Sequence, residues 1–278
     1  MDAPDAICFS PELTQAQFLR IRRILYLHCG INLRDGKEGL VKSRLTKRLR
    51  KLGILSLEQY LHLLRRDDAR DELLAMVDAL TTNKTSFFRE PSHFEFLRRQ
   101  ILPSFRAGHE PIRIWSAGCS SGEEPYSVAM LLRENITDID HYDCRILATD
   151  ICSRILDCAR QGHYGNGALD HVPPQYIRKY FIPDGTTGDR TYRVTDSLRN
   201  MIRFARLNLL AQWPMRGLFD LVLCRNVMIY FDKPTQTALV KRFWTILKKG
   251  GYLLVGHSES LTGSTPDFTY VRPATYVK

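Results

Sequence analysis

From residue 112 onward, short apolar segments alternate with segments of helical periodicity, and this alternation limits the fold more than any other feature of the chain. Strands separated by helices of this length form right-handed βαβ units, which build a mostly parallel sheet. We expect a last, antiparallel strand at the sheet edge. The expected strands are 112–115, 145–149, 202–207, 218–224, 252–255 and 268–277, and the expected helices are 122–133, 153–161 and 233–247, the last ended by Gly250 and Gly251.

The residues before this alternation predict helices only. Apolar positions recur there at helical spacing, with a serine and proline start at Ser10-Pro11, a glycine stop at Gly53 and a capping-box pattern at Ser56 and Gln59. The second helix is expected at about 37–52 and the fourth at about 68–80. The predicted buried positions of the first two helices are Phe18, Ile21, Leu25, His28, Val41, Leu45, Leu49 and Leu52.

These patterns predict three parts. Residues 1–82 form an all-α bundle, and residues 83–278 form an α/β unit. Within the second part, residues 163–199 are rich in glycine and proline, and only 190–194 there has the pattern of a strand. We interpret 163–199 as a small β-rich insertion at the rim of the sheet.

Cysteine usage and hydropathy indicate a protein of the cytoplasm. The seven cysteines are scattered without a Cys-x-x-Cys pair, which disfavours a disulfide framework and a zinc site and predicts small buried side chains. No apolar run approaches the roughly 18 residues that cross a bilayer, and the first residues lack a secretory signal. The net charge of +10 predicts an acidic partner without saying which kind.

A glycine-containing loop at 116–122, with the pattern Ser-x-Gly-x-Ser-x-Gly, follows the first strand and precedes a helix. Backbone N–H groups at such a corner can approach a ligand closely. A plain tight turn explains the pattern equally well, because the middle glycine is replaced by serine. Asp150 narrows the choice, since it ends the second strand, where a carboxylate can bind the hydroxyls of an adenosine ribose.

An acidic pair, Glu123 and Glu124, stands directly after the last glycine of the loop. Two carboxylates at a helix N-terminus repel a pyrophosphate but suit a cofactor that carries an ammonium and a sulfonium. The chain also lacks a Walker lysine after the loop and a Gly-x-Gly-x-x-Gly run, which disfavours ATP, NAD and FAD. The predicted cofactor is therefore S-adenosylmethionine, with S-adenosylhomocysteine as product and no metal.

Four motifs together resemble the chemotaxis receptor methyltransferases of the CheR family, and the resemblance covers nearly the whole chain. They are Thr-Thr-Asn-Lys-Thr-Ser-Phe-Phe-Arg-Glu at 81–90, the segment 116–127 ending in Gly-Glu-Glu-Pro-Tyr-Ser, Ala-Thr-Asp-Ile at 148–151, and Cys-Arg-Asn-Val-Met-Ile-Tyr-Phe at 224–231. The resemblance implies methyl transfer to glutamate side chains of membrane chemoreceptors. It also implies a Rossmann-like S-adenosylmethionine-dependent methyltransferase domain with a small β-rich insertion, preceded by an all-α bundle.

The resemblance also implies roles for individual residues. Arg89 and Tyr230 match the positions that face the methyl group and the incoming carboxylate, although a surface arginine and a core tyrosine beside Phe231 would explain them as well. Gly118 belongs to the cofactor loop. Cofactor contacts are assigned to Asn83, Thr85, Arg89, Glu123, Asp150, Asn208, Leu209, Arg225 and Asn226.

The chemistry of the implied acceptor agrees with the absence of an evident general base. A glutamate carboxylate, with a pKa near 4.3, is already ionised at neutral pH. Such a reaction needs positioning and exclusion of water, which an arginine fork can assist. The run His257-Ser258-Glu259-Ser260 suggests a catalytic triad, but residues adjacent along a strand point to opposite faces, so we disfavour it.

The helix at 37–52 carries a basic face. Between residues 34 and 51 there are eight basic and two acidic residues. A solvated surface explains such a run, but a docking surface for acidic receptor helices explains it too, and we favour docking. The predicted docking residues are Arg44, Lys47, Arg48 and Lys51.

Two other functions compete with methylation of chemoreceptors. Basic charge also suits nucleic acid, but the segment 224–230 has neither the Asn/Asp-Pro-Pro-aromatic run nor the Pro-Cys nucleophile of nucleic-acid methyltransferases. A non-catalytic scaffold that binds S-adenosylmethionine is the third hypothesis. The predicted partners are thus the cytoplasmic signalling domains of chemoreceptors, without nucleic acid or membrane insertion, and the expected state is a monomer.

Overall fold

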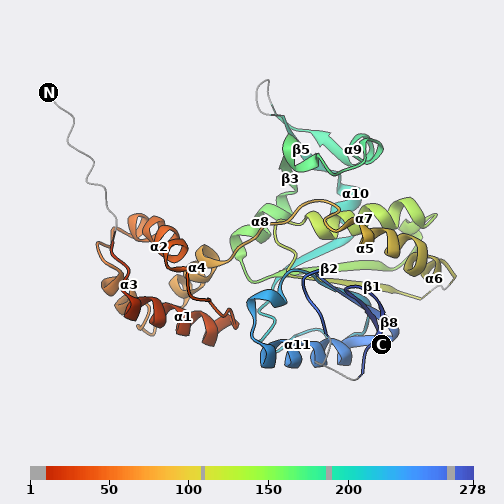
Figure 1. Cartoon of the computed structure of the whole chain (residues 1–278). Coiled ribbons are helices and arrows are strands. Elements are labelled where there is room, and N and C mark those ends of the chain that lie inside the picture. Colours follow the sequence, from red (N-terminus) through yellow and green to blue (C-terminus); the bar gives the residue numbers. More distant parts are fainter. Residues whose placement is uncertain (1–10, 108–109, 186–189, 262–266) are drawn as a thin grey trace. The chain divides into compact units, whose positions relative to one another are not determined.

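The computed structural model describes residues 11–107, 110–185, 190–261 and 267–278 (Figure 1). By its internal contacts, the chain divides into two compact units, residues 1–82 and 83–278. Within the described residues, no helix is both long enough and apolar enough to cross a membrane. Six cysteines lie in these ranges and all are free thiols, five of them buried and Cys158 exposed, whereas Cys8 lies outside the described residues.

The N-terminal unit consists of helices. Their bounds are α1 (Gln15–Cys29), α2 (Glu38–Leu52), α3 (Leu57–Leu63) and α4 (Arg70–Leu80). The predicted stripe is buried at Phe18, Ile21, Leu25, Val41, Leu45 and Leu49.

Three details of the predicted helices were wrong. The first helix begins at Gln15, where Thr14 and Gln17 form a capping box, and the predicted cap at Ser10 lies outside the described residues. His28 is exposed and Cys29 is buried in its place, because position 29 continues the i, i+4 spacing from Leu25. Leu52, at the last turn of α2, remains 37% exposed.

The predicted end of the second helix and the predicted start of the third agree with the structure. Gly53 ends α2 in the left-handed conformation, as expected. At the start of α3, the side chain of Ser56 accepts a hydrogen bond from the Gln59 N–H. The Gln59 side chain, however, accepts from Leu55 N–H instead of closing the box on Ser56.

The second unit is built on a seven-stranded sheet of order β6-β2-β1-β7-β8-β10-β9. Strands β6, β2, β1, β7 and β8 are parallel, and β10 is antiparallel to both β8 and β9. Its strands are β1 (Ile112–Ala117), β2 (Cys144–Asp150), β6 (Ile202–Arg206), β7 (Phe219–Cys224), β8 (Leu247–Val255), β9 (Thr269–Arg272) and β10 (Thr275–Val277). The α/β prediction is confirmed, and the expected last strand is a pair, β9 and β10.

Helices cover both faces of this sheet, as Figure 1 shows. One face packs with α5 and α7, and its core includes Ile114, Ile146 and Leu223. The other face packs with α11, and its core includes Trp115 and Val222. Alternate residues of each strand therefore serve two cores. The helices are α5 (Pro91–Phe96), α6 (Leu102–Ala107), α7 (Glu123–Asn135), α8 (Ser153–Gln161) and α11 (Lys233–Ile246), with single turns η1 (Leu97–Ile101), η2 (Ile139–His141) and η4 (Met228–Tyr230).

The expected helix break at Gly250 and Gly251 was wrong. Helix α11 already ends at Ile246, and β8 begins at the next residue. The glycine pair lies inside β8, opposite the place where its register against β7 shifts between Phe219 and Leu221. These glycines therefore mark an irregularity in the strand instead of the end of a helix.

The segment 163–199 is a small sheet with helices, and it contains more strands than the sequence indicated. Its strands pair in the order β3-β5-β4, all antiparallel. Only β5 was expected, because strands of three residues are too short to show an alternating pattern. The elements are β3 (His163–Gly165), η3 (Asn166–Leu169), α9 (Pro174–Tyr180), β4 (Phe181–Pro183), β5 (Thr191–Val194) and α10 (Asp196–Arg199).

Candidate active site

The loop between β1 and α7 lies at the carboxyl edge of the parallel strands, where α/β folds bind their ligands. Gly118 N–H donates to the Thr149 carbonyl at 2.8 Å, which holds the loop on the end of β2. Gly118 has a φ of 92°, and a Cβ there would lie 2.3 Å from Cγ2 of Val227. This glycine is therefore required for close packing against the segment that follows β7.

Asp150 ends β2 and organises the same loop. Its carboxylate accepts the Ser120 N–H at 2.9 Å and the Cys152 N–H at 3.0 Å, and the residue is only 8% exposed. The neighbouring strand reaches this edge too, since Leu207 N–H donates to the Asp150 carbonyl at 2.9 Å. Asn208 and Leu209 follow directly. The structure thus brings these three predicted residues to one edge of the sheet.

The two acidic residues at the start of α7 have different surroundings. Glu124 is buried and accepts hydrogen bonds from Ser116 Oγ at 2.7 Å and Arg225 Nη1 at 2.9 Å. Glu123 is buried as well, but the described residues supply no lysine, arginine or histidine to pair with it, and Ser121 Oγ donates to it at 2.6 Å. Burial raises the pKa of both carboxyls. The predicted acidic pair is therefore a single unpaired carboxylate beside an ion-paired one.

The carboxylates of Glu123 and Asp150 fit S-adenosylmethionine. A buried carboxylate without a counter-ion is costly, and a cationic ligand removes that cost. Glu123 thus provides a partner for an ammonium or sulfonium group. Asp150, whose carboxylate oxygens can accept further hydrogen bonds, provides acceptors for hydroxyl groups. The acceptor groups at this edge fit the predicted cofactor.

Arg225 follows β7 and joins separate parts of the site. Its side chain is 2% exposed, and Nη2 lies 3.0 Å from Glu90 Oε2, while Nη1 bonds Glu124. Nη2 also donates to the carbonyl of Arg89. Its Nε is buried and has no hydrogen-bond partner in the described part of the chain. The guanidinium is thus ion-paired with two carboxylates, and the predicted cofactor contact of Arg225 stays a prediction.

The segment before α5, residues 83–90, is hydrogen-bonded to the cofactor loop and to α7. Ser120 Oγ donates to the carbonyl of Asn83 at 2.8 Å, and Phe88 N–H donates to Ser127 Oγ at 3.0 Å. Asn83, Thr85 and Arg89 are half-buried. These bonds bring the predicted residues of this segment beside the loop and the start of α7.

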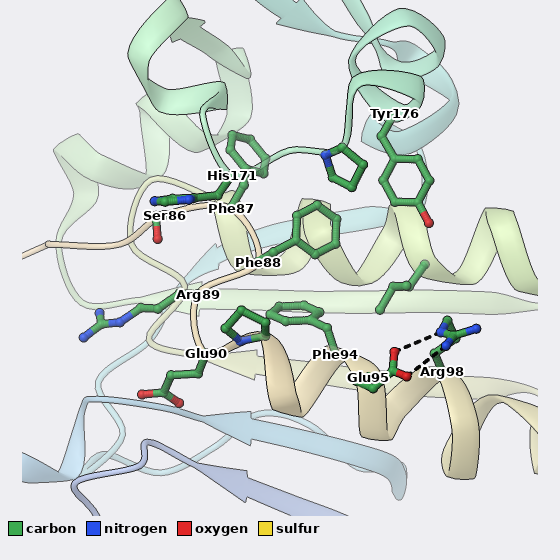
Figure 2. Close-up of a pocket in the computed structure, with 13 residues that line it drawn as sticks. Ser86, Phe87, Phe88, Arg89, Glu90, Phe94, Glu95, Arg98, His171 and Tyr176 are labelled. Atoms are coloured by element: carbon green, nitrogen blue, oxygen red, sulfur yellow. Dashed lines mark hydrogen bonds and ion pairs between the residues drawn. The ribbon is translucent and has the colours of Figure 1, made fainter.

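Arg89 has an unusual environment for an arginine in a site. Its Nη1 donates to the carbonyl of Lys84 at 2.8 Å, and no carboxylate pairs with its guanidinium within the described ranges. Figure 2 shows the guanidinium directed away from the neighbouring apolar pocket. Most of its N–H groups are therefore available to an incoming carboxylate.

The apolar pocket beside Arg89 has a volume of about 560 Å³ (Figure 2). It lies between the segment before α5 and the inserted subdomain. Phe88 packs against Phe94 and Tyr176 there, with ring centroids 5.2 and 5.9 Å apart. Its walls suit an apolar group. The lining residues are Ser86, Phe87, Phe88, Arg89, Glu90, Pro91, Phe94, Glu95, Arg98, Leu131, His171, Pro173 and Tyr176.

Asn226 and Tyr230 lie on the segment that follows β7. Asn226 has a φ of 60°, and its Nδ2 donates to Glu90 Oε1 at 3.3 Å. Tyr230 is half-buried at the end of η4. Glu259 holds this segment by its backbone, accepting the Asn226 N–H at 2.9 Å and the Ile229 N–H at 3.0 Å.

Glu90 and Glu259 are site residues that sequence reasoning missed. Glu90 stood in the first family motif without a role, and its position before Pro91 marks the start of a helix. Glu259 was considered only as part of a disfavoured triad. A signal was available for Glu90, because it ends the first family motif directly before Pro91. Glu259 follows the predicted strand 252–255 but lies in none of the family motifs.

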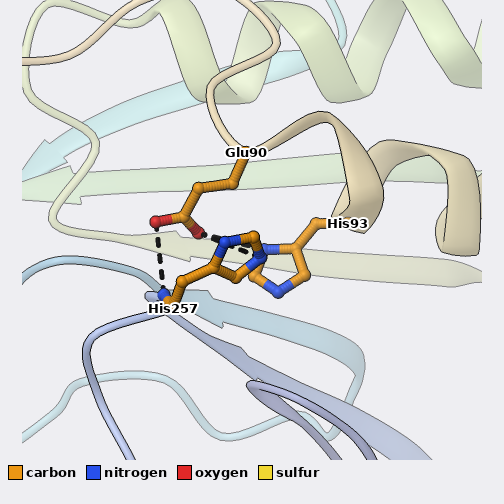
Figure 3. Close-up of side chains that lie close together, drawn as sticks. All are labelled: Glu90, His93 and His257. Atoms are coloured by element: carbon orange, nitrogen blue, oxygen red, sulfur yellow. Dashed lines mark hydrogen bonds and ion pairs between the residues drawn. The ribbon is translucent and has the colours of Figure 1, made fainter.

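Glu90, His93 and His257 form a cluster whose ligand-type atoms lie within 4.8 Å of one another (Figure 3). This set suits a metal poorly. Glu90 Oε2, which is 3.3 Å from His93 Nδ1, already binds Arg225 at 3.0 Å. His93 Nε2 is buried without the hydrogen-bond partner that a metal-bound imidazole usually has. Burial, with the nearby Arg225 charge, lowers the pKa of His93 to about 3, so its ring is neutral.

Two arginines of the basic face of α2 are bonded within their own unit. Arg44 Nη1 donates to the carbonyls of Leu80 and Thr81 at 2.7 and 2.8 Å, and Arg48 pairs with Glu72 on α4. Both arginines are half-buried, whereas Lys47 and Lys51 are exposed. The long side chains of the two arginines bend back to bind groups of their own unit, and the docking role of all four residues stays a prediction.

The fold and the acidic edge together define the second unit as a Rossmann-like methyltransferase domain that binds S-adenosylmethionine. The chain belongs to the CheR methyltransferase family. The family's profiles match as "CheR methyltransferase, all-alpha domain" at residues 16–81 and "CheR methyltransferase, SAM binding domain" at residues 83–277. The predicted family is confirmed.

Curated relatives match almost end to end. The chemotaxis protein methyltransferase of Borreliella burgdorferi is 39% identical over 274 residues, covering 96% of this chain and 95% of that protein. The chemotaxis protein methyltransferase of Escherichia coli is 40% identical, covering 92% and 88%. Chemotaxis protein methyltransferase 2 of Pseudomonas aeruginosa is 42% identical, covering 89% and 87%. Methylation in chemotaxis is thus the class of activity to which this chain belongs.

Proposed function

We propose that this protein transfers the methyl group of S-adenosylmethionine to glutamate side chains of membrane chemoreceptors, giving glutamyl methyl esters and S-adenosylhomocysteine. The observation that carries the proposal is Arg89. It lies on a segment fastened to the cofactor loop, and its guanidinium has no carboxylate partner among the residues described. A carboxylate acceptor would pair with this guanidinium both by charge and by two parallel hydrogen bonds.

For the cofactor, we assign the buried carboxylate of Glu123 to the cationic amino-acid end and Asp150 to the ribose hydroxyls. The bound cofactor supplies a methyl group on a positively charged sulfur. Asn208 and Leu209 follow β6 beside Asp150, where they can border the base. Contacts from the remaining predicted residues, Asn83, Thr85, Gly118 and Asn226, surround the same edge.

For the acceptor, the chain needs to orient a group and has no proton to remove. The glutamate is ionised at neutral pH, so a general base has no task. Arg89 holds the carboxylate by a fork of N–H groups, and Tyr230 donates its hydroxyl to it. Too strong a hold would stabilise the ground state, so these residues act by alignment.

The N-terminal unit, residues 1–82, we assign to receptor docking, in the cytoplasm and as a monomer. The exposed Lys47 and Lys51 support attraction of acidic receptor helices. Arg44 contributes positive charge at longer range, because its guanidinium donates to backbone carbonyls, whereas Glu72 balances the charge of Arg48.

The test is methyl transfer from tritiated S-adenosylmethionine to receptor signalling domains, with and without their C-terminal tails, and to DNA and RNA. We expect base-labile label in receptor glutamates only. Arg89→Ala should lower kcat/KM by about 10²-fold, with a much smaller loss of cofactor affinity. Arg99→Ala, which removes an exposed arginine paired with Glu95, is the matched control and should keep full activity. Label in nucleic acid, or full activity of Arg89→Ala, would contradict the proposal.

A further inference from the structure

The turn after β8 contains a buried carboxylate for which the reaction has no direct use. Glu259 is 7% exposed, and no basic side chain pairs with it in the part of the chain described. Its carboxylate accepts the backbone N–H groups of Gly256 at 2.6 Å, Asn226 at 2.9 Å and Ile229 at 3.0 Å. Glu259 therefore links the end of β8 to the segment that follows β7.

The segment held in this way has a backbone that needs support. Asn226 has a φ of 60°, a left-handed conformation that residues other than glycine adopt infrequently. The Asn226 N–H points to Glu259, and the Asn226 side chain donates to Glu90 at 3.3 Å. Two carboxylates from different parts of the chain thus hold one strained residue.

Gly256 makes this approach possible. A Cβ at position 256 would lie 2.5 Å from Asn226 Nδ2 and 2.9 Å from Glu259 Oε2. Real Cβ atoms do not come so close to other heavy atoms, and Asn226 would have to move. The turn and the segment are therefore fitted to each other at atomic contact.

The bonds require both oxygens of a carboxylate. Oε2 accepts from Gly256 and Asn226, and Oε1 accepts from Ile229. A glutamine has one acceptor oxygen and would turn an NH2 group toward an N–H. Burial disfavours the charge and raises the pKa of the Glu259 carboxyl, and the N–H donors offset part of that cost.

We propose that Glu259 is a positioning residue that fixes the segment from Arg225 to Tyr230, so that Asn226 faces the cofactor and Tyr230 faces the acceptor. This inference rests on the proposed function for the roles of those two residues. Glu259 touches neither ligand and acts through the backbone of the segment.

The test compares Glu259→Gln with a matched change at Asp220, near the start of β7, the strand whose following segment Glu259 holds. Asp220, in β7, is also a poorly exposed carboxylate that accepts a backbone N–H, from Arg113 at 2.7 Å, and it pairs with Lys248 at 2.7 Å. Glu259→Gln should lower kcat by about 10²-fold and weaken binding of S-adenosylhomocysteine measured by calorimetry. Asp220→Asn should lower the melting temperature at least as much and leave kcat unchanged.

Two further variants separate positioning from loss of folding. Glu259→Asp keeps two acceptor oxygens and should recover part of kcat. Gly256→Ala keeps Glu259 but displaces Asn226, and it should lower kcat in a folded protein even where Glu259→Gln does not fold. The proposal is overturned by normal kcat and normal S-adenosylhomocysteine affinity in Gly256→Ala or in Glu259→Gln. Because S-adenosylhomocysteine binding needs no acceptor, this readout stands even if receptors are not the substrate.

Discussion

Each unit of the protein contains a partly or fully buried arginine that pairs with glutamate. In the N-terminal unit, Arg48 forms a bidentate ion pair with Glu72. The Glu72 carboxylate also accepts a hydrogen bond from the Tyr60 hydroxyl at 2.6 Å. One positive and one negative charge balance there. The Arg48 and Glu72 side chains are 20% and 11% exposed, so water still reaches the pair.

In the C-terminal unit, Arg225 stands between two carboxylates, Glu90 and Glu124, and is 2% exposed. When both carboxylates are ionised, this group carries one negative charge in excess. Burial opposes the charge of Glu90, but the Arg225 guanidinium and further hydrogen bonds outweigh it and lower the pKa of that carboxyl. Glu123, next in the chain to Glu124, adds another buried acidic group, and no basic side chain among the described residues pairs with it.

The two groups differ in their net charge: the Arg48–Glu72 pair is neutral, whereas the Arg225 group has excess acidic side chains. A balanced pair with all its donors and acceptors used holds helices together and offers nothing to a ligand. An edge with excess acidic groups is complete only when a cation binds. The sequence contains arginine and glutamate in both units, so the number of these residues does not show which unit holds the ligand site.

The largest expected effect comes from Arg225→Met. This change leaves Glu90 and Glu124 buried without a counter-ion, so we expect the free energy of unfolding to fall by about 3–5 kcal/mol, with loss of methyl transfer. Urea unfolding measures the first, and the tritium assay below the melting temperature measures the second. A variant as stable as the parent protein would mean that Arg225 is not what neutralises this edge.

Glu123→Gln should separate binding from stability. We expect S-adenosylmethionine affinity to fall by about 10-fold to 100-fold, from loss of a charged partner, while the cofactor-free protein gains stability at neutral pH. Calorimetry and thermal melting without cofactor measure the two effects. A stability loss at pH 7 would show that Glu123 is already compensated within the protein.

The same variant has a defined pH dependence. The folded-state pKa of Glu123 lies above its ordinary value of 4.5, so the folded chain holds this proton more tightly than the unfolded chain. The cost of the buried charge is therefore full above the raised pKa and shrinks as the pH falls from that pKa toward 4.5. The stability advantage of Glu123→Gln should shrink over that window, and an advantage that grows on acidification would contradict the sign.

Arg48→Met tests the balanced pair. We expect a loss of about 1–3 kcal/mol in the free energy of unfolding, because Glu72 keeps only the Tyr60 hydroxyl, and no change in kcat on a folded sample. Adding Glu72→Gln should recover part of the stability. A fall in kcat with normal stability would assign Arg48 a role in docking instead.

The smallest effect is expected for Lys47→Glu with Lys51→Glu. Both side chains are exposed, so stability should change little. The rate of receptor methylation at low salt should fall by about 2-fold to 10-fold, and the difference should vanish at high ionic strength. Lys249→Glu, an exposed lysine of the other unit, is the control. An unchanged rate at low salt would remove these lysines from the docking surface.

Periodicity and loop chemistry were enough to predict the main elements of the fold. Helix α8 has the bounds expected for it, and the parallel strands lie where apolar runs indicated. The three-residue strands β3 and β4 were missed, because so short a segment has no period. The glycines of β8 were misread, since a glycine pair marks a strand irregularity as readily as a helix end.

The sequence predicted which segments lie at the candidate site, but it did not predict which side chains pair there. The segments bearing Arg89, Glu123 and Asp150 do meet at one edge of the sheet. Sequence could not show that Arg225 faces two carboxylates or that Arg44 turns onto its own unit. Such pairings join residues far apart in the chain, and only the folded backbone decides which of several carboxylates an arginine meets.

The order of these segments along the chain also determines when the binding edge of the sheet can form during synthesis. The loop after β1, the end of β2 and the segment after β7 are made in that order, but Glu259 leaves the ribosome only after β8. Until then, Asn226 lacks one of the two carboxylates that hold it. A nascent chain can therefore form the helical unit and the first strands early, yet it remains unable to present a finished binding edge until the turn after β8 has emerged.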